Sequence, residues 1–224
     1  MKALFINGSP RKNWNTHKLL ESAMKGASEA GAETELIHLR DLNFKGCVSC
    51  FACKVKNSKT NGLCAFKDSL TPVLEKALNS DVVVMGSPIY FSYPTAGMRA
   101  FLERFMFPVL SYNVKNMSGE GEKILNRTIH TAMIYTMGMP TEEMMNENHY
   151  PEILGENARF LEFLFGHTET LCAYNTYQFN DYSRYDVADF IEPMKAKHKA
   201  EQFPKDLQNA YELGKHLVEK TKNN

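Results

Sequence analysis

The stretch that decides the fold is residues 3–16, which read ALFINGSPRKNWNT. Its first residues form an apolar run typical of a buried β-strand, and a Gly-Ser-Pro turn ends that strand. Residues 16–30 then carry apolar side chains at helical spacing, and Gly31 stops the helix. The sequence therefore predicts a strand that runs through a polar turn directly into a helix.

The rest of the chain repeats this alternation of strand and helix. Further strands are predicted over residues 34–39, 81–86, 129–135 and 170–174, and further helices over residues 70–78, 95–107, 153–165 and 205–220. Five strands alternating with helices predict an α/β fold, with one parallel sheet covered on both faces. Residues 108–127 and 175–204 fall outside the alternation. The second of these is crowded with Tyr and Phe, which fits a dimer surface, a cover over a ligand, or packing on the body.

The overall composition excludes some classes of function. The 224 residues include 26 basic and 26 acidic side chains, so the formal net charge is zero. Without an excess of Lys and Arg to neutralise phosphates, we expect no nucleic-acid partner and no binding to an anionic membrane. The sequence shows no secretory signal pattern and no apolar run long enough to span a bilayer. We therefore expect a cytoplasmic protein.

The first turn has the chemistry of an anion site. It is dense in hydroxyl and amide side chains, and it leads into a helix whose free N–H groups and positive dipole end favour an anion. The turn matches neither the glycine fingerprint of dinucleotide sites nor that of nucleoside-triphosphate sites. It suits the terminal phosphate of a mononucleotide such as FMN. The alternative is a plain loop in which Asn15 or Thr16 caps the helix.

A second segment fits the ring of such a ligand. Residues 86–96 read GSPIYFSYPTA, and their prolines and aromatic side chains offer a rigid, flat, apolar wall. A third loop, residues 135–139, follows the next strand and would close the other side. The carboxyl ends of parallel strands lie at one edge of a sheet, so we expect the three loops to meet. The alternative is an aromatic turn packed on a helix.

Together these motifs resemble the flavodoxin-like NAD(P)H-dependent FMN reductases, and most closely their iron–sulfur flavoprotein branch. The motifs that carry the likeness are GSPRK at residues 8–12 with Asn15 and Thr16, and SPIYF at residues 87–91 with the helix of residues 98–104. The resemblance implies a flavodoxin-like, doubly wound, five-stranded parallel sheet that binds FMN within residues 1–175. Residues 176–224 would form a C-terminal extension and closing helix packed on the same domain.

The resemblance also implies the residues of the site. Position by position, the phosphate would be held by Ser9, Arg11, Asn15 and Thr16, the flavin ring would be lined by Pro88, Ile89, Tyr90 and Phe91, and the pocket would be completed by Thr136 and Gly138. The flavin carries the chemistry, so no catalytic acid or base is nominated. Family members usually have Gly where this chain has Trp14, and an indole there would cover the phosphate or the edge of the ring.

The function that the resemblance implies is electron transfer. We expect an FMN-dependent oxidoreductase that passes electrons from NAD(P)H or a protein donor to a quinone, a flavin, a nitro-aromatic compound or a redox partner. The alternative is a flavodoxin-like electron carrier without a small-molecule substrate, although the neutral net charge argues mildly against an acidic carrier. A flavin-binding regulator is a third interpretation. Related flavoproteins form oligomers, so a homodimer or homotetramer is expected.

Four of the five cysteines fall in one short stretch. Cys47, Cys50 and Cys53 are spaced as in the compact run that holds four-iron clusters, and Cys64 follows after ten residues as a possible fourth ligand. In iron–sulfur flavoproteins this last gap is generally shorter. A zinc ion, or free thiols that line the flavin site, are the alternatives. Cys172 is expected to be a small buried apolar residue.

Overall fold

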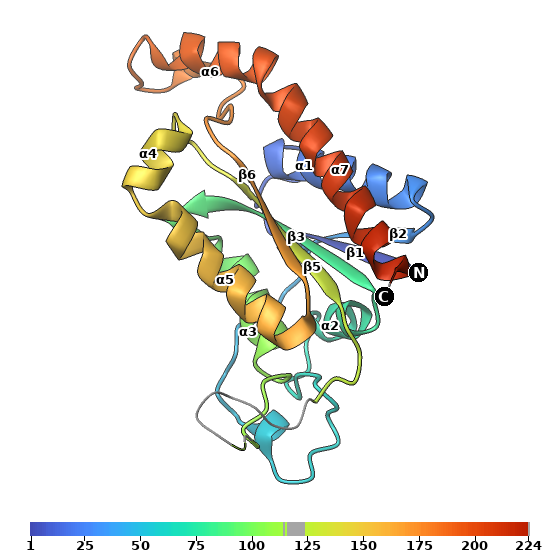
Figure 1. The fold of residues 1–224 in the computed structure, drawn as a ribbon. Helices are drawn as coiled ribbons and strands as arrows, with labels where there is room; N and C mark the ends of the chain where they lie inside the picture. The colour runs from blue at the N-terminus through green and yellow to red at the C-terminus, as the bar shows by residue number, and fades with distance from the viewer. Residues whose placement is uncertain (114, 116–123, 224) are drawn as a thin grey trace.

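The computed structural model describes residues 1–113, 115 and 124–223, and it places one sheet between two layers of helices (Figure 1). The strands are β1 (Lys2–Asn7), β2 (Glu33–His38), β3 (Val82–Tyr90), β4 (Tyr93–Pro94), β5 (His130–Thr136) and β6 (Thr168–Ala173). Five of them are parallel, in the order β2-β1-β3-β5-β6, and β4 is a two-residue strand paired antiparallel with the end of β3. This is the flavodoxin-like strand order. The predicted fold class is confirmed.

Helices cover both faces of the sheet. They are α1 (Asn15–Glu29), α2 (Thr71–Leu78), α3 (Ala96–Met106), α4 (Glu142–Glu147), α5 (Tyr150–Phe165), α6 (Ile191–Glu201) and α7 (Phe203–Lys222). Along β1, Leu4 and Ile6 join the core beneath α2, α3 and α5, whereas Ala3 and Phe5 join the core beneath α1 and α7. Because both faces of β1 are buried, its apolar run is continuous rather than alternating.

The C-terminal helix α7 packs directly against α1, which lies near the N-terminus of the chain (Figure 1). Two glycines allow this approach. A Cβ atom on Gly26 would lie 2.0 Å from the carbonyl oxygen of Tyr211, and one on Gly214 would lie 1.9 Å from that of Ala23. The two helix backbones therefore touch where any larger residue would separate them.

The structure corrects several expected boundaries. The predicted strand over residues 81–86 continues to Tyr90, because a turn at Phe91 and Ser92 (φ 49° and 69°) folds β4 back onto it. Residues 175–204, which fall outside the predicted alternation of strand and helix, contain α6. Residues 108–127 lie partly outside the described residues. None of the helices in the described ranges is long and apolar enough to cross a membrane.

Candidate functional site

Three loops converge at the carboxyl edge of the sheet, as the sequence predicted. The Thr95 hydroxyl, at the start of α3, donates to the carbonyl oxygen of Gly8 at 2.8 Å. The hydroxyl groups of Thr16 and Thr136 lie 2.8 Å apart and share a hydrogen bond. The turn after β1 is thus joined to the segment after β3 by one contact and to the end of β5 by the other.

Gly8 sets the position of the first turn. Its N–H donates to the carbonyl oxygen of Gly86 on β3 at 2.8 Å, which extends the pairing of β1 and β3 by one residue. A Cβ atom at Gly8 would lie 2.9 Å from the Cβ of Met98, so a larger residue would push the turn away from α3. The turn consequently leaves the sheet close to the N-terminus of α1.

The candidate phosphate residues Ser9 and Thr16 are both buried at this N-terminus, 3% and 2% exposed. The Ser9 hydroxyl accepts from the Arg11 N–H at 3.1 Å, and the Ser9 N–H donates to Asn7 Oδ1 at 2.9 Å. Among the described residues no side chain caps α1. The alternative in which Asn15 or Thr16 serves as a cap is therefore wrong. The first-turn N–H groups remain available to an anion.

The other two candidate phosphate residues reach toward the C-terminal extension. The Arg11 guanidinium donates from Nη1 to the carbonyl oxygen of Gln178 at 2.5 Å. The Tyr177 carbonyl oxygen accepts from Asn15 Nδ2 at 2.8 Å and from Trp14 Nε1 at 3.0 Å. The guanidinium of Arg11 also lies over the Trp14 ring, 4.6 Å from its centroid. Apart from the aromatic crowding of the extension, no sequence pattern predicted this contact.

The candidate ring residues divide into two pairs. Pro88 and Ile89 are partly buried at the end of β3, beside the three loops. Tyr90 and Phe91 lie at the hairpin tip, where they are 48% and 99% exposed. The structure thus places an apolar wall next to the loops and leaves two aromatic rings projecting from it. Thr136, the register partner of Pro88 on the neighbouring strand β5, is buried.

A buried lysine connects the extension to the third loop. Lys195 on α6 is 3% exposed, and its ammonium group donates to the Gly138 carbonyl at 3.2 Å. It also donates to Asn175 Oδ1 at 3.1 Å and to the Thr176 carbonyl at 3.3 Å. Burial lowers the pKa of Lys195. The sequence did not indicate this residue, because a lysine in a polar helix ordinarily faces water.

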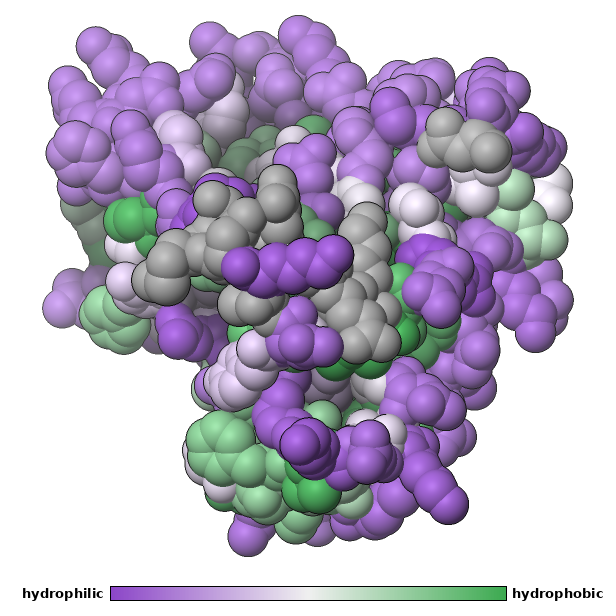
Figure 2. Space-filling model, turned by 60° about the horizontal axis from the view of Figure 1, so that its bottom comes forward, coloured by the Kyte–Doolittle hydropathy of each residue, from purple (hydrophilic) through white to green (hydrophobic). Residues whose placement is uncertain are grey.

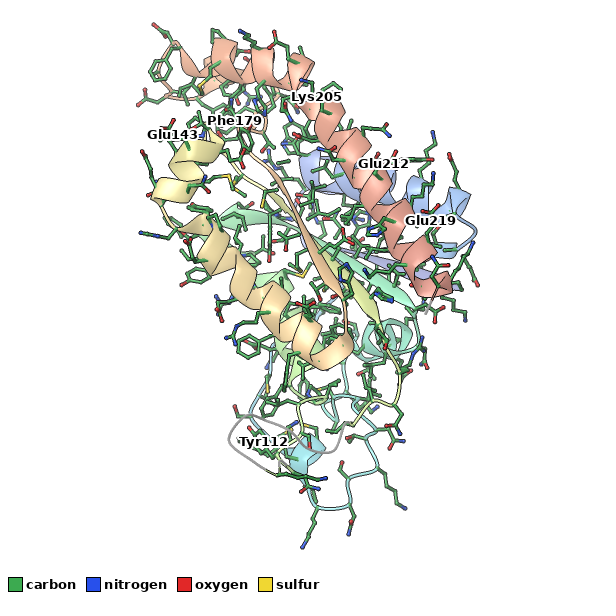
Figure 3. The ribbon with its side chains drawn as sticks, viewed as in Figure 1. Tyr112, Glu143, Phe179, Lys205, Glu212 and Glu219 are labelled. Carbon is green, nitrogen blue, oxygen red and sulfur yellow. The ribbon has the colours of Figure 1, made fainter. Side chains whose placement is uncertain are left out.

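Residues 45–68, which carry the four clustered cysteines and are called the cysteine segment, lie far from the three loops. The four cysteines line one cavity with Glu103, Arg104, Phe107 and Pro108, at the C-terminal end of α3. Thr95, at the N-terminal end of α3, belongs to the loops, and an eleven-residue helix is about 16 Å long. Figure 3 shows Tyr112 near the cysteine segment and Phe179 in the extension at opposite ends of the molecule. Within one chain, the four cysteines therefore lie away from the three loops.

The thiols of this cavity differ in environment. Cys47 and Cys50 are exposed, Cys53 is partly buried and Cys64 is buried, and all are free. Burial raises the pKa of the Cys53 thiol. In the described ranges no three Cys, His, Asp or Glu side chains are arranged to hold a metal ion. The cysteines thus share one cavity without forming a ligand set, and no electron-transfer step is derived through a cluster. Cys172, on β6, is partly buried, and burial raises the pKa of its thiol to about 11.

Arg104 fastens the cysteine segment to α3. Its side chain is fully buried, and Nε donates to the Cys64 sulfur at 3.4 Å. Nη1 donates to Asp68 Oδ2 at 2.6 Å and to the Lys45 carbonyl at 3.0 Å, and Nη2 donates to the Phe66 carbonyl at 2.7 Å. The guanidinium of Arg104 therefore binds both ends of the cysteine segment.

Figure 2 turns the bottom of the Figure 1 view forward and shows apolar side chains exposed among hydrophilic ones.

Comparison with known proteins agrees with the fold and the loops. The architecture defines a flavodoxin-like protein. The sequence pattern of the NADPH-dependent FMN reductase family matches residues 1–139, more than half of the chain, and the chain belongs to this family. The resemblance stated from the two loop motifs is thereby confirmed.

Curated relatives support the branch as well. An iron–sulfur flavoprotein of Methanocaldococcus jannaschii is 32% identical over 119 residues, which cover 53% of this chain and 59% of the relative. An iron–sulfur flavoprotein of Archaeoglobus fulgidus is 38% identical over 117 residues, which cover 52% and 55%. The matched region thus spans little more than half the length of either relative.

Solved structures share the fold over nearly the whole chain. An NAD(P)H:quinone oxidoreductase from Methanothermobacter marburgensis has a TM-score of 0.65 and 17% identity, with 97% of this chain and 98% of that chain covered. An FMN-dependent NADH-azoreductase from Bacillus anthracis, solved in complex with FMN, has a TM-score of 0.59 and 13% identity, with 98% and 99% covered. At these identities the likeness concerns the fold alone.

Proposed function

We propose that this chain is an FMN-dependent oxidoreductase that takes electrons from NAD(P)H or a protein donor and passes them to a quinone, a flavin, a nitro-aromatic compound or a redox partner. The observation that carries the proposal is the convergence of three loops around the uncapped N-terminus of α1. Family membership supports it. The location proposed for this activity is the cytoplasm.

Different residues of the loops bind the phosphate and the flavin ring. The N–H groups of the first turn of α1, with the Ser9 and Thr16 hydroxyls, bind the phosphate, because a helix N-terminus stabilises a negative charge. Pro88 and Ile89 shield one side of the ring from water. When bound, the flavin supplies the hydride and electron chemistry. The protein supplies position, dryness and hydrogen-bond donors.

The phosphate site is tested by replacing one hydroxyl. Ser9→Ala removes a buried donor to a charged group, so FMN affinity should fall by about tenfold, whereas riboflavin, which lacks the phosphate, should bind as before. Ser28→Ala, at an exposed position on α1, is the matched control. Flavin fluorescence titration measures all three proteins. Equal loss of FMN and riboflavin affinity would place the phosphate elsewhere.

The electron-carrier alternative makes a different kinetic prediction. An oxidoreductase sustains NAD(P)H oxidation when a small quinone or nitro-aromatic acceptor is present. A carrier does not, and is instead reduced reversibly by a ferredoxin system. A regulator would bind FMN that no donor reduces. Steady-state assays with NAD(P)H and with a ferredoxin system as electron donors distinguish the oxidoreductase, the carrier and the regulator.

An iron–sulfur cluster on the four cysteines is a second cofactor to test. The names of the relatives favour it, whereas the small cavity that the cysteines share and the present arrangement of the described side chains do not. Anaerobic purification followed by iron and acid-labile sulfide analysis decides the matter. Stoichiometric FMN without iron or sulfide would exclude the cluster, and bound zinc would identify the remaining metal alternative.

We also propose a homodimer or homotetramer. The exposed rings at the hairpin tip, Tyr90, Phe91 and Tyr93, together with Tyr185 and Phe190 in the extension, support this assembly. Gel filtration with light scattering should give twice or four times the chain mass of 25.5 kDa. A mass equal to that of one chain would contradict it.

A further inference from the structure

A chain of hydrogen bonds connects the end of β2 to the turn after β1. His38 is the last residue of β2, and its register partner on β1 is Asn7. Nδ1 of the His38 ring lies 3.1 Å from Nδ2 of the Asn7 amide. The other end of the same amide, Oδ1, accepts the N–H of Ser9 at 2.9 Å. His38, which no motif singled out, therefore contacts the candidate phosphate turn through one buried side chain.

The Asn7 amide determines which nitrogen of the His38 ring carries a proton. Because Oδ1 of Asn7 accepts from Ser9, the group that faces His38 is the NH₂ group, which only donates. Nδ1 of His38 must then accept, and a neutral imidazole that accepts at Nδ1 carries its proton on Nε2. Asn7 is 0% exposed, so water does not replace either partner. The chain of hydrogen bonds thus requires a neutral His38.

Protonation of His38 would break this chain. An imidazolium has an N–H group at each nitrogen, so two donors would face each other across 3.1 Å. The Asn7 amide would then have to rotate or withdraw. Rotation would present its NH₂ group to the Ser9 N–H, and withdrawal would leave that N–H without its acceptor. In both cases Ser9 loses the hydrogen bond that positions it in the turn, which is unfavourable for a buried group.

Charged and titratable groups from three segments face the His38 ring. The His17 ring on α1 lies 5.3 Å away between centroids, and His17 pairs with Glu21 on the same helix. Lys12 in the turn pairs with Asp41, which lies just after β2. Burial lowers the pKa of His38, and the charges of His17 and Lys12 act in the same direction. The charges of Asp41 and Glu21 raise it by less, so the neutral ring predominates at pH 7.

We infer that His38 is a positioning residue of the phosphate site, which in its neutral form holds Ser9 through Asn7 in the conformation that binds a phosphate group. Protonation of His38 and binding of the phosphate then oppose each other. By linkage, the affinity for the phosphate falls when His38 is protonated, and a bound phosphate favours the neutral ring. The inference rests on the proposed function, because it presupposes that a flavin phosphate binds at the N-terminus of α1.

Electrostatic attraction alone would have the opposite sign. An imidazolium near a phosphate attracts it, so charge alone would strengthen binding at low pH and make the ring easier to protonate in the complex. The hydrogen bonds through Asn7 predict weaker binding at low pH and a ring that is harder to protonate in the complex. The sign of the effect therefore separates positioning through Asn7 from attraction by charge.

NMR of the unmodified protein gives the first test. In ¹⁵N-labelled protein freed of any bound flavin, the assigned His38 ring should carry its proton on Nε2 at neutral pH. Addition of FMN should lower the pKa of His38. A proton on Nδ1, or a pKa that rises when FMN binds, would overturn the inference. If neither FMN nor riboflavin binds at any pH, the proposed function itself fails, which is a different result.

A variant that cannot be protonated gives the second test. His38→Asn keeps an acceptor oxygen close to the place of Nδ1. Between about pH 8 and about pH 5, the FMN affinity of the unmodified protein should fall about threefold further than that of His38→Asn. The phosphate of FMN gains a proton in this range in both proteins, so the difference belongs to His38. Riboflavin, which lacks the phosphate, should show no such difference. His216→Asn, at an exposed position of α7, is the matched control and should behave as the unmodified protein.

Two results of these titrations would contradict the role of His38. One is the same pH dependence of FMN affinity in the unmodified protein and in His38→Asn. The other concerns His38→Leu, which offers Asn7 no acceptor and should bind FMN about tenfold more weakly at about pH 8, with riboflavin affinity unchanged. Equal FMN affinity in His38→Leu and the unmodified protein would contradict the inference. If a variant fails to fold, as judged by circular dichroism, the NMR measurements on the unmodified protein decide.

Discussion

At the scale of single residues, Arg104 makes several contacts that a substitution would remove. It is buried, it forms an ion pair with Asp68, and it donates to two carbonyl groups and the Cys64 sulfur. Burial works to raise the pKa of Asp68, but hydrogen bonds from Arg104 and from backbone N–H groups outweigh it, so the pKa lies below its usual value. The carboxylate therefore stays charged and depends on its partner.

Replacing Arg104 should destabilise the protein strongly. Arg104→Met leaves Asp68 and two carbonyl groups without their partner, and the free energy of unfolding should fall by about 3–5 kcal/mol. Arg99→Met, at an exposed position of the same helix, should change it by less than about 0.5 kcal/mol. Urea denaturation measures both. A loss below about 1 kcal/mol for Arg104→Met would mean that the segment is held by other contacts.

Asp206 makes stability depend on pH in a predictable direction. It is 4% exposed, and its Oδ2 finds no hydrogen-bond partner in the described part of the chain. Burial raises the pKa of Asp206, opposed by the hydrogen bond from Gln202 and by the charges of His198 and Lys205. The buried carboxylate is thus fully charged, and unfavourable, above its folded pKa. As pH falls through that value, protonation relieves the penalty.

Asp206→Asn should consequently stabilise the protein at pH 7, by about 1 kcal/mol. The gain should shrink as the pH approaches about 4, where the native carboxyl group is itself protonated. Urea denaturation at several pH values, with the exposed Asp189→Asn as control, measures this dependence. A gain that is the same at pH 7 and pH 4 would show that the charge of Asp206 is not its cause.

At the scale of secondary-structure elements, the contact between α1 and α7 depends on two small residues. Gly214 has no room for a side chain against the backbone of α1. Gly155 on α5, by contrast, has nothing within 4 Å of the place where a Cβ would lie. The two positions separate packing from helix propensity, because both are glycines inside helices.

The same substitution should therefore have opposite effects at the two sites. Gly214→Ala should lower the free energy of unfolding by about 1–3 kcal/mol, because the clash outweighs the gain in helix propensity. Gly155→Ala should raise it by about 0.5–1 kcal/mol. Thermal and urea denaturation compare them. Stabilisation of the chain by Gly214→Ala would show that α7 does not lie this close to α1.

The burial of each element explains how well the sequence predicted it. The central strands β1, β3 and β5 were predicted because both faces of each are covered, which leaves apolar runs such as residues 82–85. The helix α6 was missed because its inward face is a lysine rather than an apolar stripe. The extension of β3 was missed because Pro88 indicated a turn, whereas the turn lies at Phe91 and Ser92.

The site was predicted in part for a comparable reason. The loops follow strand ends, so topology brings Ser9, Thr16 and Thr136 together without further information. The position of the cysteines depends instead on the side-chain contacts of Arg104, which no local pattern records. The contacts of residues 174–178 with the loops depend on a buried lysine and on backbone carbonyl groups, whose partners a sequence does not specify.

At the scale of the whole molecule, two chemically different regions lie at opposite ends of α3. The loops occupy the carboxyl edge of the sheet, and the cysteine cavity lies at the other end of the helix. A substitution in one region should therefore leave the structure of the other region unchanged. The flavin should bind whether or not the cysteines hold a metal.

The proposed function requires that the three loops bind FMN and that this FMN accepts electrons from a donor. The most direct measurement is the visible spectrum of recombinant protein, purified without added flavin and reconstituted with FMN, then mixed anaerobically with NADH or NADPH. We expect about one flavin per chain, whose absorbance is bleached by the donor and restored by a quinone. Protein that retains no FMN after gel filtration would contradict it.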